Sequence, residues 1–359
     1  MKSELLTRKE CTAIRGVAIL AIMLHNYTHW LKGIVRENEY TWQHEKWDQL
    51  WQVVQNPDEL LPMHLLSFFG HYGVPVFLFL SGYGLVKKYE QSGLPETSVW
   101  RFIRYNYLKL FRILIVGFVA FIMLDAITPN MHRYLWTEVV AILGMFANFL
   151  EHPARVIWPG PYWYFSITLQ LYILYRLVFY RWRHWGVIAV CIVVCWAWQL
   201  YGHNNMVLLE RLRYNLIGGM LPFGIGLLLA RYEQRLLKDW KVTTGTPLML
   251  AWLLNLVLAV GFIFYASSFY SHWLWVPAMI IWGTIPLVKL MPAKVLSYSA
   301  WLGSISAAVF VIHPIVRKVF VRPYYEHDQY TGLLLYAVAT IFLSWLFMNL
   351  IHKIPSPRL

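Results

Sequence analysis

The first apolar segment of the sequence carries polar side chains that an ordinary membrane helix avoids. Four of them lie within residues 11–31, namely Arg15, His25, Asn26 and His29. At about 100° per residue in an α-helix, Asn26 and His29 point within about 40° of the direction of Arg15. His25 lies about 80° away. A charged side chain inside a membrane costs a few kcal/mol, so such residues usually face a cavity or a partner. The segment predicts a helix with one functional polar stripe.

These residue types indicate proton transfer beside a site for an anion. A histidine can take a proton from a hydroxyl group because its unperturbed pKa lies near neutral pH. An arginine stays protonated and cannot act as a base, but it binds phosphate groups bidentately. The competing interpretation is that Arg15 reaches the lipid headgroups and that the histidines are satisfied by packing.

Two further histidines lie in apolar segments. His71 lies in residues 63–86, where Gly70 and Gly73 allow close approach of another helix. His313 lies near the end of residues 298–316. There a structural role at the membrane interface competes with a catalytic one.

The elements that position these side chains must be membrane helices, because the composition excludes a soluble fold. Of the 359 residues, 58% are hydrophobic and only 14% are charged, whereas a soluble domain carries about 25% charged residues. The apolar residues form blocks of about 16–24 residues, the length that crosses a hydrocarbon core of about 30 Å. Such continuous blocks exclude an outer-membrane barrel, whose strands alternate over about ten residues. The predicted fold class is all-α, a polytopic membrane helix bundle.

We predict about ten transmembrane helices with both termini in the cytoplasm. The spans are residues 11–31, 63–86, 106–126, 162–180, 186–201, 213–230, 247–267, 271–288, 298–316 and 331–351. In this topology the inside segments hold 21 of the 31 Lys and Arg residues, as the positive-inside rule requires. If residues 134–150 also crossed, this asymmetry would largely vanish. That stretch is therefore expected to lie at the outer interface or to be re-entrant.

The net charge of +13 is explained by the cytoplasmic loops, so no nucleic-acid partner is expected. Residues 1–359 are predicted to form a single membrane domain, with an extracytoplasmic loop at 32–62 and a short cytoplasmic tail at 352–359. The loop carries Trp42, Trp47 and Trp51. Their spacing of four or five suits an amphipathic helix lying in the membrane interface.

Three motifs follow one another along these segments. Arg-Gly-x-Ala-Ile begins at Arg15 and is followed by His25. A glycine-rich stretch, Gly-His-Tyr-Gly-Val-Pro-Val-Phe-Leu-Phe-Leu-Ser-Gly, begins at Gly70. Gly-x-Ile-Ser-x-x-x-Phe-x-x-His-Pro begins at Gly303. In this order they resemble the acyltransferase 3 family of bacterial integral-membrane enzymes, which is related to enzymes that O-acetylate surface polysaccharides.

The resemblance implies a ten-helix bundle in the cytoplasmic (inner) membrane of a bacterium. Such an enzyme moves an acyl group, typically acetyl, from acyl-CoA met on the cytoplasmic side to a hydroxyl of a cell-envelope polysaccharide or glycolipid. Acyl-CoA is then a co-substrate; no permanently bound cofactor and no metal are expected.

The resemblance also assigns candidate site residues. It places the family's essential histidine at His25, which would act as the base. Arg15, the second candidate catalytic residue, would bind CoA phosphate or orient the thioester. The residues expected to hold CoA are Arg15, Arg104, Lys109 and Arg112. The candidates on the acceptor side are His29, His71 and His313.

The sequence departs from the family pattern at two places. Many members have an acidic residue where this chain has Thr168, which weakens a role for a carboxylate there. The family's Arg-x-x-Arg before a proline is Lys109-x-x-Arg112 here, without the proline.

Two other classes stay open at this point. A transporter or flippase of a small solute or lipid-linked sugar would also have about ten helices with buried polar residues. Its usual sign is an internal repeat with matching broken helices, and no such repeat is found. A non-catalytic receptor or scaffold would have no need of an Arg–His stripe.

Overall fold

The computed structural model describes residues 4–93, 95–239, 246–324 and 328–358, and every regular element in these ranges is helical. The long helices are α1 (Arg8–Thr28), α4 (Gly73–Tyr89), α5 (Val99–Ile127), α8 (Trp163–Leu174), α9 (Trp185–Tyr201), α11 (Leu216–Asp239), α12 (Thr246–Ser267), α14 (Val276–Leu290), α16 (Ser306–Tyr324) and α17 (Gln329–Lys353). The shorter ones are α2 (His44–Gln55), α3 (Leu61–Phe69), α6 (Trp136–Leu143), α7 (Pro153–Val156), α10 (Met206–Tyr214), α13 (Tyr270–Trp273) and α15 (Ala293–Ser304). Single turns are η1 (Gly70–Tyr72), η2 (Ala147–Phe149), η3 (Gly160–Tyr162) and η5 (Gly202–Asn204), and a π-helical turn, η4 (Tyr175–Phe179), continues α8.

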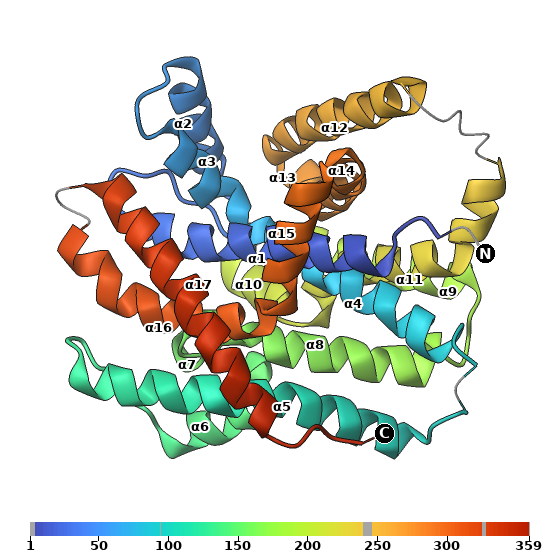
Figure 1. The fold of residues 1–359 in the computed structure, drawn as a ribbon, viewed down its shortest axis with the longest axis horizontal. Helices are drawn as coiled ribbons and strands as arrows, with labels where there is room; N and C mark the ends of the chain where they lie inside the picture. The colour runs from blue at the N-terminus through green and yellow to red at the C-terminus, as the bar shows by residue number, and fades with distance from the viewer. Residues whose placement is uncertain (1–3, 94, 240–245, 325–327, 359) are drawn as a thin grey trace.

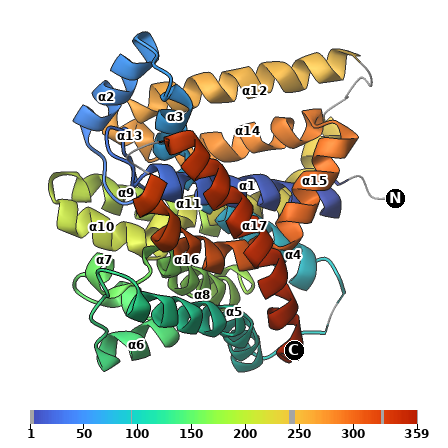
Figure 2. The ribbon, with the colours of Figure 1, turned by 60° about the vertical axis from the view of Figure 1, so that its left-hand side comes forward.

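Helix α1 runs through the middle of the bundle. Helices α12 and α14 lie on one side of it, and α5 and α6 lie on the other, in both Figure 1 and Figure 2. Contacts with α3, α4, α15 and α16 surround α1. A helix with this many polar side chains fits a membrane bundle because other helices shield it from lipid.

Each of the ten predicted spans contains a helix, and the chain is a multi-pass membrane protein. Six helical segments in the described ranges are long and apolar enough to cross a membrane. They are Leu61–Tyr89, Val99–Ile127, Trp185–Asn204, Leu216–Leu236, Pro247–Ser267 and Gln329–Lys353. Ten crossings and cytoplasmic termini stay predictions.

The segment 298–316, predicted as one span, is not a single helix. Helices α15 and α16 meet there at an angle of 71°. Glycines explain the geometry, because they allow α15 to lie directly on α1. A Cβ atom on Gly16 would lie 1.9 Å from the Ser299 carbonyl oxygen, and one on Gly303 would lie 1.8 Å from the Thr12 carbonyl oxygen. Helix α15 packs on α1 through these glycines, and the chain then bends before α16 begins.

One predicted boundary also moves. The span expected at 213–230 begins only at Leu216, because Arg213 and Tyr214 belong to the separate helix α10. The chain is extended at Asn215, which separates the two helices.

The stretch 134–150 holds no single helix long enough to cross. Helix α6 has eight residues and is therefore about 12 Å long, against about 30 Å for the hydrocarbon core. It ends before Met145, whose φ of 57° lies in the left-handed region. This is the short, interrupted element that the sequence led us to expect.

The loop at 32–62 contains the expected helix, but only two of the three tryptophans lie within that helix. Trp47 and Trp51 lie in α2 with ring centroids 6.1 Å apart. Trp42 precedes the helix, and its indole Nε1 donates a hydrogen bond of 3.2 Å to the Ser267 carbonyl. It therefore fastens the loop to the end of α12.

Candidate active site

The polar residues of α1 line two cavities. His25, Asn26 and His29 line a cavity of about 170 Å³, which we call the histidine cavity. One side of a second cavity, of about 220 Å³, is formed by Arg15 and Lys109; we call it the arginine cavity. In a regular helix Arg15 and His25 are about 15 Å apart along the axis.

An apolar wall separates the two cavities. Ile22, Val74 and Phe310 border both of them. They come from α1, α4 and α16, so the wall forms where three helices meet. The two cavities therefore lie end to end, divided only by side chains.

His25 is buried and has a defined orientation. Its Nδ1 lies 2.9 Å from the Ser67 carbonyl oxygen. A carbonyl oxygen can only accept a hydrogen bond, so Nδ1 carries the proton of the neutral ring. The lone pair then belongs to Nε2, which is the arrangement that a general base needs.

Two glycines create this geometry by bringing the α3–η1–α4 segment against α1. A Cβ atom on Gly73 would lie 2.3 Å from the Ala18 carbonyl oxygen, and one on Gly70 would lie 2.7 Å from the Cβ atom of His25. Larger residues would push the two backbones apart. Both close approaches hold the end of α3, and with it the Ser67 carbonyl, against α1.

His71 joins His25 and makes a close contact with Glu37, a residue that the sequence analysis missed. The ring centroid of His25 lies 5.3 Å from that of His71. It lies 5.0 Å from the ring centroid of His29, which is one helical turn further along the chain. His71 Nε2 is 3.0 Å from Glu37 Oε2, and both side chains are at most 3% exposed. Glu37 is one of six acidic residues in the loop at 32–61, and no local pattern distinguishes it from the others.

Arg317 is a second residue that the sequence analysis missed. It lies on α16, lines the histidine cavity and is 8% exposed. Its Nη1 donates a hydrogen bond of 3.1 Å to Asn26 Oδ1. An arginine four residues after His313 in an apolar stretch was the available signal, but it fell one residue beyond the span drawn there.

The remaining predicted residues lie elsewhere. Arg112 Nη1 donates to the Ile354 carbonyl and to Ser356 Oγ in the C-terminal tail, at 3.1 and 2.6 Å. Arg104 is exposed on α5, and His313 is fully buried with Nδ1 donating to the Val309 carbonyl at 3.1 Å. Within the described ranges, none of these three lines either cavity. Thr168, where the resemblance led us to note a missing carboxylate, is buried.

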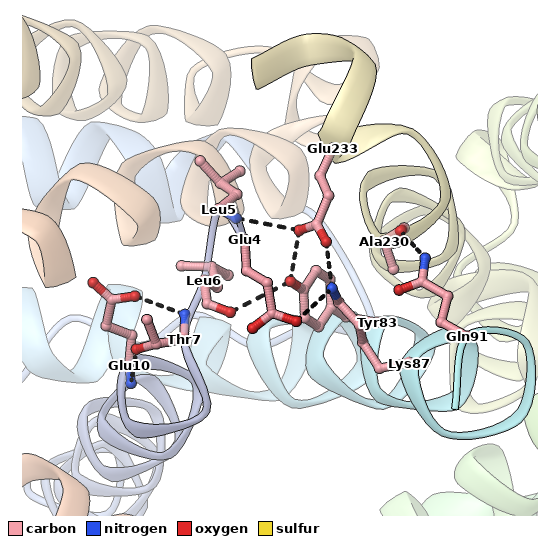
Figure 3. Close-up of polar contacts among 10 residues, drawn as sticks. All are labelled: Glu4, Leu5, Leu6, Thr7, Glu10, Tyr83, Lys87, Gln91, Ala230 and Glu233. Atoms are coloured by element: carbon pink, nitrogen blue, oxygen red, sulfur yellow. Dashed lines mark hydrogen bonds and ion pairs between the residues drawn. The ribbon is translucent and has the colours of Figure 1, made fainter. Parts of the chain in front are cut away.

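The start of α1 is anchored by a buried carboxylate (Figure 3). Glu233 of α11 is fully buried; it accepts a hydrogen bond of 2.7 Å from the Tyr83 hydroxyl and pairs with Lys87. It also accepts the Leu5 backbone N–H at 3.4 Å, just before α1 begins. Thr7 and Glu10 then form a reciprocal cap on the helix. These contacts fix the beginning of the helix that carries Arg15 and His25.

Comparison with known proteins now identifies the family. A family model described as an acyltransferase domain matches residues 9–349. The chain belongs to the acyltransferase 3 family. Neither a curated protein nor a solved structure matches the chain significantly.

The match runs from α1 into α17, so both cavities lie within the acyltransferase domain. The protein is therefore a membrane acyltransferase, and the resemblance inferred from the three motifs is confirmed. The transporter and receptor alternatives are no longer needed.

Proposed function

We propose that the protein transfers an acyl group, such as acetyl, from acyl-CoA to a hydroxyl group of a cell-envelope polysaccharide or glycolipid. The observation that supports this proposal most directly is the pair of cavities that meet at Ile22, Val74 and Phe310. One contains an oriented histidine and the other contains two cations. Donor and acceptor can approach such a site from opposite ends.

The arginine cavity suits the donor. Arg15 and Lys109 supply positive charge for the phosphate groups of CoA. Apolar side chains, among them Phe77, Ile113 and Phe165, line the rest of this cavity and would contact the pantetheine arm. In this arrangement the thioester reaches Ile22, Val74 and Phe310 at the border of the two cavities. These side chains must move apart for the thioester to meet the acceptor hydroxyl.

The histidine cavity suits the acceptor, and His25 is the base. Nε2 of His25 takes the proton of the acceptor hydroxyl as its oxygen attacks the thioester carbonyl carbon. The C–S bond then breaks, and the leaving CoA thiolate takes the proton back from the His25 imidazolium. The products are an ester and free CoA, and no acyl-enzyme is required.

Glu37 and His71 act as positioning residues in this proposal. The carboxylate of Glu37 holds the His71 ring against the edge of the His25 ring. A negative charge nearby also favours the His25 imidazolium that forms during transfer. We place the Arg15 end of α1 at the cytoplasmic face of a bacterial inner membrane, where acyl-CoA is available.

Purified protein in detergent or nanodiscs, incubated with acetyl-CoA labelled in the acetyl group, tests the proposal. We expect label to enter an extracted cell-envelope fraction with stoichiometric release of free CoA. A His25→Ala protein is the matched control. It should neither transfer label to the envelope fraction nor release free CoA. Acetyl-CoA that binds but yields no label in any envelope fraction would contradict the proposed acceptor class.

A further inference from the structure

A third cavity adjoins the histidine cavity. It measures about 230 Å³, and its lining residues are Trp30, Phe121, Pro129, Asn130, Trp158, Arg317 and Lys318. Trp30, Trp158 and Arg317 line the histidine cavity as well. A ligand could therefore occupy both cavities at once, and we call the third one the side cavity.

Among the residues that the structure describes, the lining of the side cavity holds two cations and no acidic side chain. Lys318 pairs with Asp125, a fully buried carboxylate on α5. Asp125 also accepts the His132 backbone N–H at 2.8 Å and the Tyr134 hydroxyl at 3.0 Å. The charge of Lys318 is thus compensated within the protein.

The charge of Arg317 is not compensated in this way. Its contacts in the described ranges are the hydrogen bond to the neutral Asn26 amide and the face of Trp30, 4.7 Å from the guanidinium carbon. No carboxylate in the described part of the chain lies within ion-pair distance. A buried charge without a counter-charge costs several kcal/mol, and a bound anion would remove that cost.

We infer that Arg317 binds a carboxylate or phosphate group carried by the acceptor glycan, in the side cavity beside the hydroxyl that reacts. This inference rests on the proposed function. A planar guanidinium binds either anion through two parallel hydrogen bonds. The flat indoles of Trp30 and Trp158 offer apolar area for the sugar ring that carries the charge.

An acidic side chain in the lining of the histidine cavity determines which of the two cavities binds the anion. Glu39 lines the histidine cavity and would repel a negative group there. Burial raises the pKa of the Glu39 carboxyl, so the repulsion increases as the pH rises and this carboxyl ionises. The anionic unit therefore occupies the side cavity, and a neighbouring unit presents its hydroxyl to His25.

Matched sugars test this inference directly. Binding to the whole protein in nanodiscs would be measured by isothermal titration calorimetry for methyl glucuronide, methyl glucoside, glucose 1-phosphate and inorganic phosphate. We expect each charged sugar to bind about 10–100-fold more tightly than the glucoside, the range expected for hydrogen bonds to a charged group. Inorganic phosphate lacks the ring that the tryptophans would contact, so we expect weaker binding than for glucose 1-phosphate.

Arg317→Gln should reduce the preference for the charged sugars to about twofold or less, while Arg317→Lys should keep part of it. Arg155→Gln, which changes an exposed arginine, is the control and should leave all four affinities unchanged. A preference that survives Arg317→Gln would overturn the inference.

The wild-type measurement decides the question even if Arg317→Gln does not fold. Equal binding of glucuronide, glucose 1-phosphate and glucoside would overturn the anion site. Equal binding of inorganic phosphate and glucose 1-phosphate would overturn its assignment to a glycan. Acetyl transfer from acetyl-CoA, measured separately in the same preparation, reports on the proposed function independently of these affinities.

Discussion

At the scale of single residues, the hydrogen bond between His25 Nδ1 and the Ser67 carbonyl orients the base of the proposed mechanism. Removing a general base typically slows catalysis by about 10²–10⁴-fold. We therefore expect His25→Ala to lower the transfer rate by at least this range. Acyl-CoA binding should stay intact, because we propose that the donor binds in the other cavity. Single-turnover transfer and equilibrium binding of CoA would be measured on the same preparation.

His29→Ala is the comparison for this variant. Its ring also lines the histidine cavity, but it lies one turn further along α1. We expect a smaller loss of rate than for His25→Ala. Transfer at nearly the wild-type rate by a folded His25→Ala protein would exclude His25 as the base and leave His71 as the next residue to test.

Glu37 acts at the same scale but through His71. A loss of about 1.4–2.8 kcal/mol of transition-state stabilisation, which we expect from removing the Glu37 charge, corresponds to a rate change of about 10–100-fold. We expect Glu37→Gln to lower kcat by this amount without changing KM for acyl-CoA, and steady-state kinetics would show the split. Glu45→Gln, an exposed position in α2, is the control. An increase in the acyl-CoA KM at constant kcat would contradict a positioning role.

At the scale of helices, the crossing of α1 and α15 holds the site together. A methyl group on Gly303 would overlap the Thr12 carbonyl, at 1.8 Å, and the backbone cannot move aside without separating the helices. We expect Gly303→Ala to destabilise the protein by about 1–3 kcal/mol or more and to reduce transfer. Thermal unfolding in detergent and the transfer assay would measure the two effects.

Gly84→Ala is the matched control for this prediction. Gly84 lies inside α4 and has open space where its Cβ would be. Alanine has the higher helix propensity, by about 1 kcal/mol, so this variant should be as stable as the wild type or slightly more stable. Equal melting temperatures for the two variants would mean that the close crossing is not required.

At the scale of the whole molecule, the charge distribution predicts which face meets the cytoplasm. In the ten-span topology Trp182 lies inside and Trp51 lies outside, and both side chains are about half exposed. In a variant without the native cysteines, Trp182→Cys should react with an impermeant thiol reagent only after the membrane is opened. Trp51→Cys should react in intact cells. The reverse pattern would exclude the proposed orientation and with it the cytoplasmic approach of acyl-CoA.

The sequence by itself determined the class of protein and part of its site. Apolar blocks long enough to cross a bilayer must be helical, because backbone polar groups find no other partners in lipid. Helical periodicity then places Arg15 and His25 on one polar stripe, and the ordered motifs identify the family. Each apolar block and each motif is formed by residues close to one another in the chain, and the order of the motifs needs no tertiary contact.

The tertiary structure decided everything that depends on distant residues. Glu37 meets His71 and Arg317 meets Asn26 only because the loop after α1 folds back and α16 packs on α1. Arg112 has the same residue type as Arg15, yet it binds the C-terminal tail. Close approaches at glycines set these distances, and local propensity carries no information about which backbone a glycine will touch.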